Sequence, residues 1–481
     1  MFNPSIAYPM QNTAKAWMMP RELYFSLLRN PGVISNRASA LTFLQQQLEE
    51  CATKDVSMPD EINKLEDWIV ESSKEVGHQY QQYLQLRKEG APRQYFNSKA
   101  HALNFIKSVA PTKMVDGAWL YGLVKHWNDS SFSDLLDIYL EELGNGEEEN
   151  NHVAIYRKLI RTHGCEQWET LDDRYFIQGA IQLALASHAD QFLPEIIGFN
   201  LAYEQLPLHL LITAAELNEL NIDPYYFTLH ITIDNALSGH ALKAVKAVRE
   251  IASTFSDQRE FMRRLRNGAR LSNGGLGSLE IIHTFNLEQE LLQIFREKAS
   301  VGQFMHHSHC RIGGQTLQEW LSSPHEMPAL LQSLQDHGWI TRHQDPQSSR
   351  FCKLVDGHQG LMFGVFTAYE KQVLYDWIAG DYLEQLPKRE RLGESWRVRK
   401  RQMHAECHSV NNPAEASNII PLARSSTTAP SNEQILFNQQ VRSITDKEVL
   451  MRLLAAWISP AMHHYPTGLA ATRMFKAEWM N

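Results

Sequence analysis

Apolar residues recur at helical spacing along most of this chain. Within the first 90 residues, segments 40–48 and 62–70 place apolar side chains three and four positions apart, which is typical of amphipathic helices. From about residue 94 to 300 the predicted helices become longer and more apolar, and strand-like alternation is nearly absent. The sequence therefore predicts an all-α domain of the bundle type here. Its predicted helices are 97–109, 115–127, 132–143, 149–163, 173–188, 192–206, 208–219, 223–253, 257–268 and 278–297.

The pattern is mixed after residue 300. Segments 317–320 and 327–337 favour helices, whereas 339–341 and 363–367 favour short strands. Two helices and a ribbon would suit a winged helix, but the candidate second helix, 329–336, has no Lys or Arg to meet phosphates. We therefore do not expect DNA binding. The cluster His306-His307-Ser308-His309-Cys310 lacks the spacing of a zinc site and is interpreted as a polar loop.

Composition then changes towards the C-terminus. Residues 388–401 are basic, which a solvated surface explains better than an RNA or acidic-partner patch. A polar, linker-like stretch follows, and the tail predicts about two helices ending at His463-His464-Tyr465-Pro466, to which we assign no chemistry. The predicted divisions are a helical N-terminal extension (1–93), a helical bundle domain (94–300), a mixed α/β region (301–387), a basic and polar flexible linker (388–433) and C-terminal helices (434–481). The extension either packs on the core domain or makes a subunit contact.

Composition and charge narrow the class of protein. With 481 residues, 43% of them hydrophobic, the chain can bury a large core. A net charge of -9 argues against nucleic-acid binding. The five cysteines are scattered without any C-x-x-C pair, as expected of reduced thiols. Residues 1–20 lack a secretory pattern and no run approaches ~18 apolar residues, so we expect a soluble cytoplasmic protein with no membrane span.

Segment 225–242 carries the most distinctive pair of polar residues. It follows Asp223-Pro224, a common way to open a helix. His230 and Asp234 lie about 40° apart on an ideal helix, and therefore on one face. On a buried apolar helix such a pair is costly unless something neutralises it. Either a His–Asp hydrogen bond or a metal ion would do so, and this segment alone leaves both readings open.

A second candidate pair spans the break between two predicted helices. One helix ends at Gly144-Asn145-Gly146, and the next begins near Asn150 with His152 in its first turn. Glu142 and His152 can therefore converge. The acids 147–149 are explained by a helix N-terminus, but a histidine gains nothing from that dipole.

Two further carboxylates are candidates. Glu204 follows a strongly apolar helical stretch, so its burial would need a partner. Asp116 is either an N-cap or a ligand, whereas Glu195, directly after a proline, is explained as a first-turn acid. Carboxylates and histidines from several antiparallel helices, without a thiolate, are typical of di-iron and di-manganese bundles. The Glu-x-x-His pair of ferritin-like proteins is absent at these positions, which disfavours that fold.

These motifs resemble the haem-oxygenase-like di-iron oxidase family, described broadly as iron-containing redox enzymes. The resemblance rests on Glu142-Leu143-Gly144-x-Gly146 followed by His152, on His230-x-x-x-Asp234 followed by His240, and on a downstream stretch from Gly360 to Glu370. It covers about residues 110–385. It implies a haem-oxygenase-like helical bundle whose metal ligands are Glu142, His152, Glu204, His230, Asp234 and His240, with Asp116 where the family usually has a glutamate.

The position of His240 departs from the family pattern. Many members place the last histidine three residues after the aspartate, where this chain has Leu237. On a straight helix His240 would lie about 120° from Asp234 and would not share its metal. A bulge or break at Ser238-Gly239 would instead swing His240 inward.

The resemblance also implies the function. We expect two Fe(II) ions per chain, no haem, and O2 as co-substrate for N-oxygenation, desaturation or C–C cleavage of a small amino-acid-like or fatty-acid-like molecule. Tyr203, Tyr226 and Phe227 are the expected walls of its pocket, and a homodimer is possible. The principal alternative is a metal-free helical scaffold that binds a partner through its C-terminal region. A third reading, a haem-binding or thiaminase-like enzyme, would use haem or a cysteine nucleophile, for which Cys165 is the candidate within the core helices.

Overall fold

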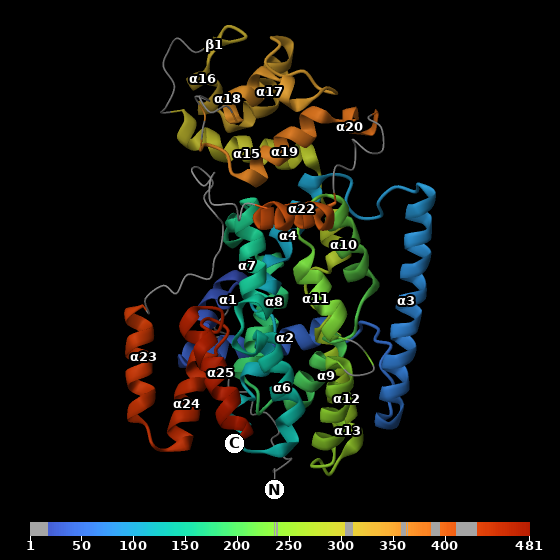
Figure 1. Ribbon diagram of the computed structural model, residues 1–481, viewed down its shortest axis with the longest axis vertical. Coiled ribbons are helices and arrows are strands. Elements are labelled where there is room, and N and C mark those ends of the chain that lie inside the picture. Colours follow the sequence, from blue (N-terminus) through green and yellow to red (C-terminus); the bar gives the residue numbers. More distant parts are fainter. Residues whose placement is uncertain are drawn as a thin grey trace.

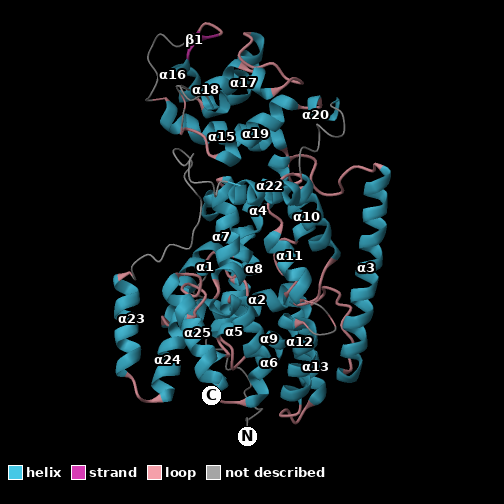
Figure 2. Ribbon diagram, viewed as in Figure 1, coloured by secondary structure: helices cyan, strands magenta, loops and turns pink. Residues whose placement is uncertain are grey.

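The computed structural model describes residues 18–234, 236, 239–303, 311–356, 362, 364–385, 395–409 and 431–481. Within these residues the fold is all-α, as the sequence predicts, apart from one two-stranded ribbon (Figure 2). The helices of the main body are α1 (Pro20–Arg29), α2 (Ile34–Cys51), α3 (Leu65–Glu89), α4 (Lys99–Lys113), α5 (Ala118–Tyr121), α6 (Ser133–Glu142), α7 (His152–His163), α8 (Ile177–Ser187), α9 (Leu193–Tyr203), α10 (Leu208–Glu219), α11 (Tyr225–Ile233), α12 (His240–Ala252), α13 (Gln258–Leu271) and α14 (Ser278–His283). None of the described helices combines the length and apolarity needed to cross a bilayer.

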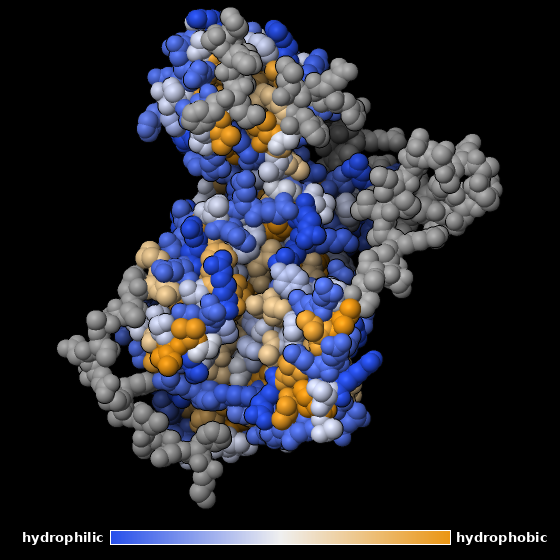
Figure 3. Space-filling model, turned by 90° about the vertical axis from the view of Figure 1, so that its left-hand side faces the viewer, coloured by the Kyte–Doolittle hydropathy of each residue, from blue (hydrophilic) through white to orange (hydrophobic). Residues whose placement is uncertain are grey.

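The later helices form two separate groups around this body (Figure 1). An upper lobe holds α15 (Leu287–Gly302), α16 (Leu317–Ser322), α17 (Met327–Asp336), α18 (Arg350–Asp356), α19 (Ala368–Ala379) and α20 (Tyr382–Gln385). Below it lie α22 (Trp396–Ser409), across the top of the bundle, and α23 (Asn432–Ser443), α24 (Lys447–Trp457) and α25 (Pro466–Met480), along one side. Seen from the side, a narrower waist joins the lobe to the body (Figure 3).

The N-terminal helices pack directly on the bundle. α1 and α2 both contact α8, and Leu23, Tyr24 and Leu44 are fully buried there. The long helix α3 runs along the opposite side of the body (Figure 1) and ends at Gly90 in a left-handed conformation. Tyr83 of α3 donates to the buried Glu216 of α10, which ties this helix to the core.

Helices α9 and α13 pack closely against each other, and two glycines allow this approach. A Cβ on Gly198 would lie 1.8 Å from the Leu265 carbonyl oxygen, and one on Gly268 would lie 1.9 Å from that of Glu195. The first-turn acid Glu195 pairs with Arg264 across the same contact, with an N–O distance of 2.6 Å. The contact fixes the position of α9, which ends directly before Glu204.

The predicted helix 115–127 is wrong in length, because the chain turns at Asp116 and Gly117. Gly117 has a φ of 78°, a left-handed conformation that cannot lie within a helix, and it directly precedes α5. Only the short α5 and a 3-10 turn at Val124–His126 follow it. The predicted helix 223–253 is likewise two helices, since α11 ends at Ile233 and α12 begins at His240. The sequence left open a straight helix or a break before His240, and the structure has the break, which turns His240 towards Asp234.

The predicted strands in the mixed region are also wrong. After α17 the chain turns at Gly338, whose φ is 68°, and the Trp339 amide donates to the Leu334 carbonyl as a helix C-terminal turn. Thr367 caps α19 in a capping box with Glu370. The strands instead are β1 (Arg311–Ile312) and β2 (Gln315–Thr316). Residues 306–310, and Gly360, Leu361 and Phe363 of the downstream motif, lie outside the described residues.

Candidate metal centre

Seven acidic and histidine side chains meet in the interior of the bundle, and most stand at helix ends. Each is at most 7% exposed. They are Asp116 in the turn before α5, Glu142 at the end of α6, His152 at the start of α7, Glu204 directly after α9, His230 within α11, Asp234 directly after α11, and His240 at the start of α12. The structure thus brings together all seven residues singled out in the sequence.

The turn between α6 and α7 explains how Glu142 and His152 come together. Two 3-10 turns, Gly144–Gly146 and Glu148–Asn150, reverse the chain, with positive φ angles at Gly144 and Gly146. Leu143 and Asn151 then pair as an isolated β-bridge. The residues on either side of that bridge are Glu142 and His152, so the bridge holds both side chains at one point.

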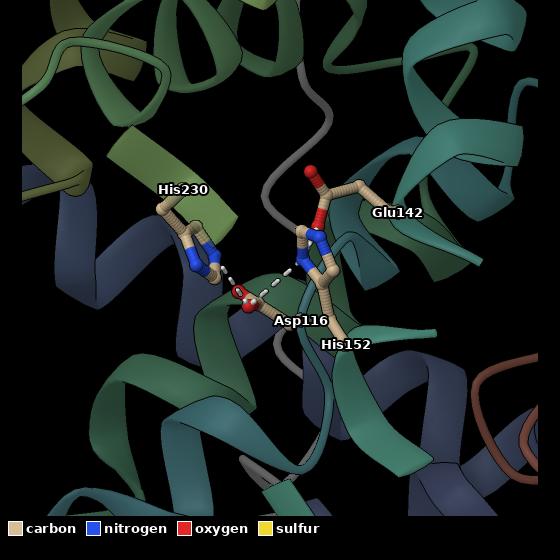
Figure 4. A group of neighbouring side chains, drawn as sticks. All are labelled: Asp116, Glu142, His152 and His230. Carbon is tan, nitrogen blue, oxygen red and sulfur yellow. Dashed lines mark hydrogen bonds and ion pairs between the residues drawn. The ribbon is translucent and has the colours of Figure 1, made fainter. Parts of the chain in front are cut away.

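The first group contains Asp116, Glu142, His152 and His230, whose candidate ligand atoms all lie within 4.8 Å of one another. His152 Nδ1 is 2.5 Å from Glu142 Oε2 and 3.6 Å from Asp116 Oδ2. His230 Nε2 approaches the same Asp116 oxygen at 3.3 Å. Figure 4 shows the two imidazole rings on either side of the Asp116 carboxylate, with Glu142 beside His152.

The second group contains Glu142, Glu204 and His240. His240 Nδ1 lies 3.0 Å from Glu204 Oε2 and 3.3 Å from Glu142 Oε1. Asp234 Oδ1 is 3.4 Å from the same nitrogen. His230 and Asp234, which share a helix face in the sequence, therefore face different groups, because α11 ends between them.

Glu142 belongs to both groups. Its Oε2 atom faces His152 of the first group, while its Oε1 atom faces His240 of the second. A carboxylate shared in this way is suited to bridge two cations. With Asp234 added to the second group, the centre contains four carboxylates and three histidines, so two divalent cations would balance the four negative charges.

Unsatisfied buried atoms test whether these residues fit a metal. Nε2 of His152 and Oε1 of Glu204 are buried without a hydrogen-bond partner within the described part of the chain. His230 Nδ1 is 2.8 Å from the Tyr226 carbonyl, which can only accept, so a neutral His230 directs its Nε2 lone pair at the Asp116 carboxylate. Lone pairs that face one another in a buried site need a proton or a metal ion between them, and these carboxylates and imidazoles therefore fit a metal.

Residues outside the two groups contact these side chains and fix their orientation. His240 Nε2 lies 2.9 Å from Glu141 Oε2, leaving Nδ1 free to face the second group, and Lys243 Nζ lies 2.7 Å from Glu141 Oε1. The Tyr226 hydroxyl donates to Asp116 Oδ2. A carboxylate or carbonyl behind a histidine is the usual arrangement around protein metal ions, where it fixes the tautomer.

The pKa values reflect the shortage of positive charge in this site. Burial alone would lower the pKa of His152, but the carboxylates of Glu142 and Asp116 raise it to about 10. Burial opposes ionisation of Glu142 as well, yet its histidine partners lower its pKa to about 2. Burial, reinforced by the Glu204 carboxylate, raises the pKa of Asp234 to about 7. The metal-free centre therefore retains protons that a divalent metal would replace.

The three expected pocket residues have different surroundings. Tyr203 is half-buried at the end of α9, and Lys113 Nζ lies 5.5 Å from its ring centroid and 5.5 Å from that of Tyr226. Tyr226 is fully buried and supports Asp116, and Phe227 packs near Phe105 with ring centroids 6.3 Å apart. Tyr203 and Tyr226 both lie beside the half-buried Lys113 cation, and Tyr226 also contacts the centre directly through Asp116.

Sequence reasoning missed several residues around the centre. Glu141 directly precedes the predicted ligand Glu142, and its spacing from His240 carries no local signal. Lys113 was not singled out although it lies close to Asp116 in the chain. Asn151 and His463 make a buried contact, with Asn151 Nδ2 3.0 Å from His463 Nδ1, across more than 300 residues.

Cys165 is buried, and its Sγ contacts the Leu103 carbonyl at 3.7 Å. Burial raises the pKa of the Cys165 thiol to about 12, which does not favour its use as a nucleophile.

Comparison with known families agrees with this geometry. Residues 103–273 match the family model described as iron-containing redox enzyme. The matched segment runs from within α4 to just beyond α13 and holds all seven residues of the centre. The match confirms the resemblance expected from the sequence: residues 103–273 are similar to the iron-containing redox enzyme family, and the described residues adopt an all-α haem-oxygenase-like fold. No curated protein and no solved structure matches the chain.

Proposed function

We propose that this protein is a non-haem di-iron oxidase or oxygenase. It would use O2 to oxidise a small amino-acid-like or fatty-acid-like substrate by N-oxygenation, desaturation or C–C cleavage. The observation that carries the proposal is the pair of buried carboxylate–histidine groups that share Glu142. Bound iron would supply the electrons that reduce O2 and the oxidising power for the substrate.

The side chains have distinct roles in this proposal. Asp116, His152 and His230 would hold one Fe(II), while Glu204, Asp234 and His240 would hold the other. Glu142 would bridge the two ions. Oxygen-rich ligation with imidazole and no thiolate suits Fe(II) better than a structural zinc ion. A haem-free centre is favoured because each of the three histidines already faces at least one carboxylate oxygen at 3.6 Å or less.

The surroundings of the centre support an acidic substrate. The Lys113 ammonium lies beside the Tyr203 and Tyr226 rings, and the carboxylates of Asp116 and Glu142 and the Tyr203 hydroxyl raise its pKa in spite of burial. A cation in that position would hold a substrate carboxylate and orient the rest of the molecule. The packed helices would exclude bulk water from the oxidation.

Iron loading and O2 exposure test the proposal. Metal-free protein is titrated anaerobically with Fe(II), freed of excess metal, and analysed for iron. It is then mixed with O2 in the presence of candidate amino acids and fatty acids, while O2 consumption and transient absorption are followed. We expect two irons per chain and substrate-stimulated O2 consumption. A chain that retains less than about 0.2 iron under these conditions would instead support the metal-free scaffold.

A further inference from the structure

The C-terminal helices hold the turn that presents two of the metal-centre residues. This turn comprises residues 143–151 and connects Glu142 to His152. The Tyr139 hydroxyl, just before the turn, donates to the Ile458 carbonyl at 2.5 Å. Within the turn, Lys476 Nζ donates to Asn145 Oδ1 at 2.8 Å, and Arg473 donates to the Gly146 carbonyl. Figure 1 shows α25 beside α6 in the lower half of the body.

The packing between α25 and the turn leaves no spare room. Gly146 has a φ of 86°, and a Cβ on it would lie 2.5 Å from the Leu469 carbonyl oxygen. Gly468, in the first turn of α25, would place its own Cβ 2.1 Å from the Met462 carbonyl oxygen. The contact of α25 with the 143–151 turn depends on Gly146, while Gly468 allows the start of α25 to pack on the backbone of Met462 and His463.

His463 makes a buried contact between this C-terminal region and the turn. It lies between α24 and α25 and is 1% exposed. Its Nδ1 atom accepts from Asn151 Nδ2, which also lies 3.1 Å from the Leu143 carbonyl oxygen. The other end of the Asn151 side chain, Oδ1, caps α7 by accepting from the Ala154 amide at 3.0 Å. Asn151 thus ties the end of α6, the start of α7 and the C-terminal region together.

We propose that residues 458–476 are a positioning element of the metal centre, with His463 acting through Asn151 on Glu142 and His152. This inference rests on the proposed metal site, and it replaces the view of the C-terminal region as a separate interaction module. Leu143 and Asn151 are the immediate neighbours of Glu142 and His152 in the chain. A shift of either backbone would therefore move a ligand atom directly. Residues that orient metal ligands in this way commonly change metal affinity about 10–100-fold when they are removed.

The test uses the full-length chain with Co(II) as a spectroscopic substitute for Fe(II). His463→Leu removes the acceptor for Asn151, whereas His463→Asn offers an oxygen in place of Nδ1. His464→Ala is the matched control, because it alters the neighbouring histidine, which has no contact with Asn151 among the described residues. Each variant is compared for the melting temperature of the metal-free protein, Co(II) affinity and the visible Co(II) spectrum.

We expect His463→Leu to lower Co(II) affinity by about 10-fold or more and to shift the spectrum. His463→Asn should restore most of both properties, and His464→Ala should retain them. Asn151→Ser keeps an oxygen to cap α7 but loses the amide donor, and it should weaken binding in the same way. If His463→Leu does not fold, the Co(II) affinity and spectrum of Asn151→Ser test the positioning role instead.

The outcomes separate this inference from the proposed function. If the wild-type chain binds two Co(II) ions and both His463→Leu and Asn151→Ser keep its affinity and spectrum, the positioning role is overturned while the metal centre stands. If the wild-type chain binds no Co(II) or Fe(II), both proposals fail. Weakened binding in His463→Leu together with equal weakening in His464→Ala would point to general destabilisation and would also overturn the inference.

Discussion

Glu142 is the residue on which both halves of the proposed centre depend. Its two oxygens face different histidines, 2.5 Å from His152 and 3.3 Å from His240. Asp234, by contrast, approaches only the second group. Substitutions at these two positions should therefore have different effects on the number of metals bound.

Glu142→Gln should abolish binding at both sites, because the neutral amide neither bridges two cations nor balances their charge. Asp234→Asn should leave about one tightly bound metal per chain. Metal content after anaerobic Fe(II) loading measures both. Glu149→Gln, an exposed acid in the same turn, is the control. Retention of two irons by Glu142→Gln would contradict the bridging role.

The protonated state of His152 makes a prediction about pH. The pKa of His152 is raised from 6.5 to about 10 in the folded chain. A raised pKa stabilises the fold fully below the unfolded value of 6.5, and this stability is lost as pH rises towards 10. The metal-free protein should therefore melt at lower temperature at pH 9 than at pH 6.5. His152→Gln should flatten this dependence in thermal melts, and an unchanged slope would count against a charged His152.

The residues of the metal centre could largely be predicted from the sequence, but their arrangement in space could not. The acids and histidines stand out in the sequence because they interrupt apolar stretches. Their division into two groups depends on where α11 stops, which the apolar run 225–233 does not reveal. The partnership of Asn151 with His463 was unpredictable because neither residue carries a local signal and only tertiary packing brings them together.

At the scale of the elements, the contact between α9 and α13 positions Glu204. The helical pattern predicted 208–219 as it is found, and most other boundaries within about four residues, but the predicted helix 278–297 is divided between α14 and α15. The pattern failed where chain reversals depend on individual glycines, as at Gly117 and Gly338. It also gave no sign that Gly198 and Gly268 mark a close helix contact, because that depends on two segments at once.

Gly198→Ala should destabilise the protein by about 1–3 kcal/mol, since its Cβ would collide with the Leu265 backbone. The displacement of α9 should also weaken the second metal more than the first. The matched control is Gly77→Ala in α3, where a Cβ meets nothing within 4 Å, so the better helix propensity of alanine should stabilise the protein slightly. Denaturant melts and Co(II) titrations measure both, and equal stability of the two variants would contradict the packing argument.

At the scale of the whole molecule, the centre joins segments from residue 116 to residue 240 and is supported by residue 463. A ligand that binds only the folded chain stabilises all of these segments together. At a free metal concentration 100 times the dissociation constant, each occupied site should add about 2.7 kcal/mol to the free energy of unfolding.

Thermal melts of the metal-free chain with and without Co(II) measure this stabilisation, and a chelator should reverse it. Glu142→Gln serves as the control and should show no shift. A wild-type chain that melts identically in both conditions would contradict a metal centre built from these segments.

The placement of four of the seven residues at helix ends has a consequence for sequence variation. Glu142 closes α6, His152 opens α7, Glu204 follows α9, and His240 opens α12. One residue inserted into any of these helices would shift a donor atom by about 1.5 Å and rotate it by about 100°, far beyond the ±0.2 Å that a coordination bond tolerates. The outward faces of the same helices are free to change. We therefore expect insertions and deletions to be excluded from these four helices in natural variants, even where their surfaces have diverged completely.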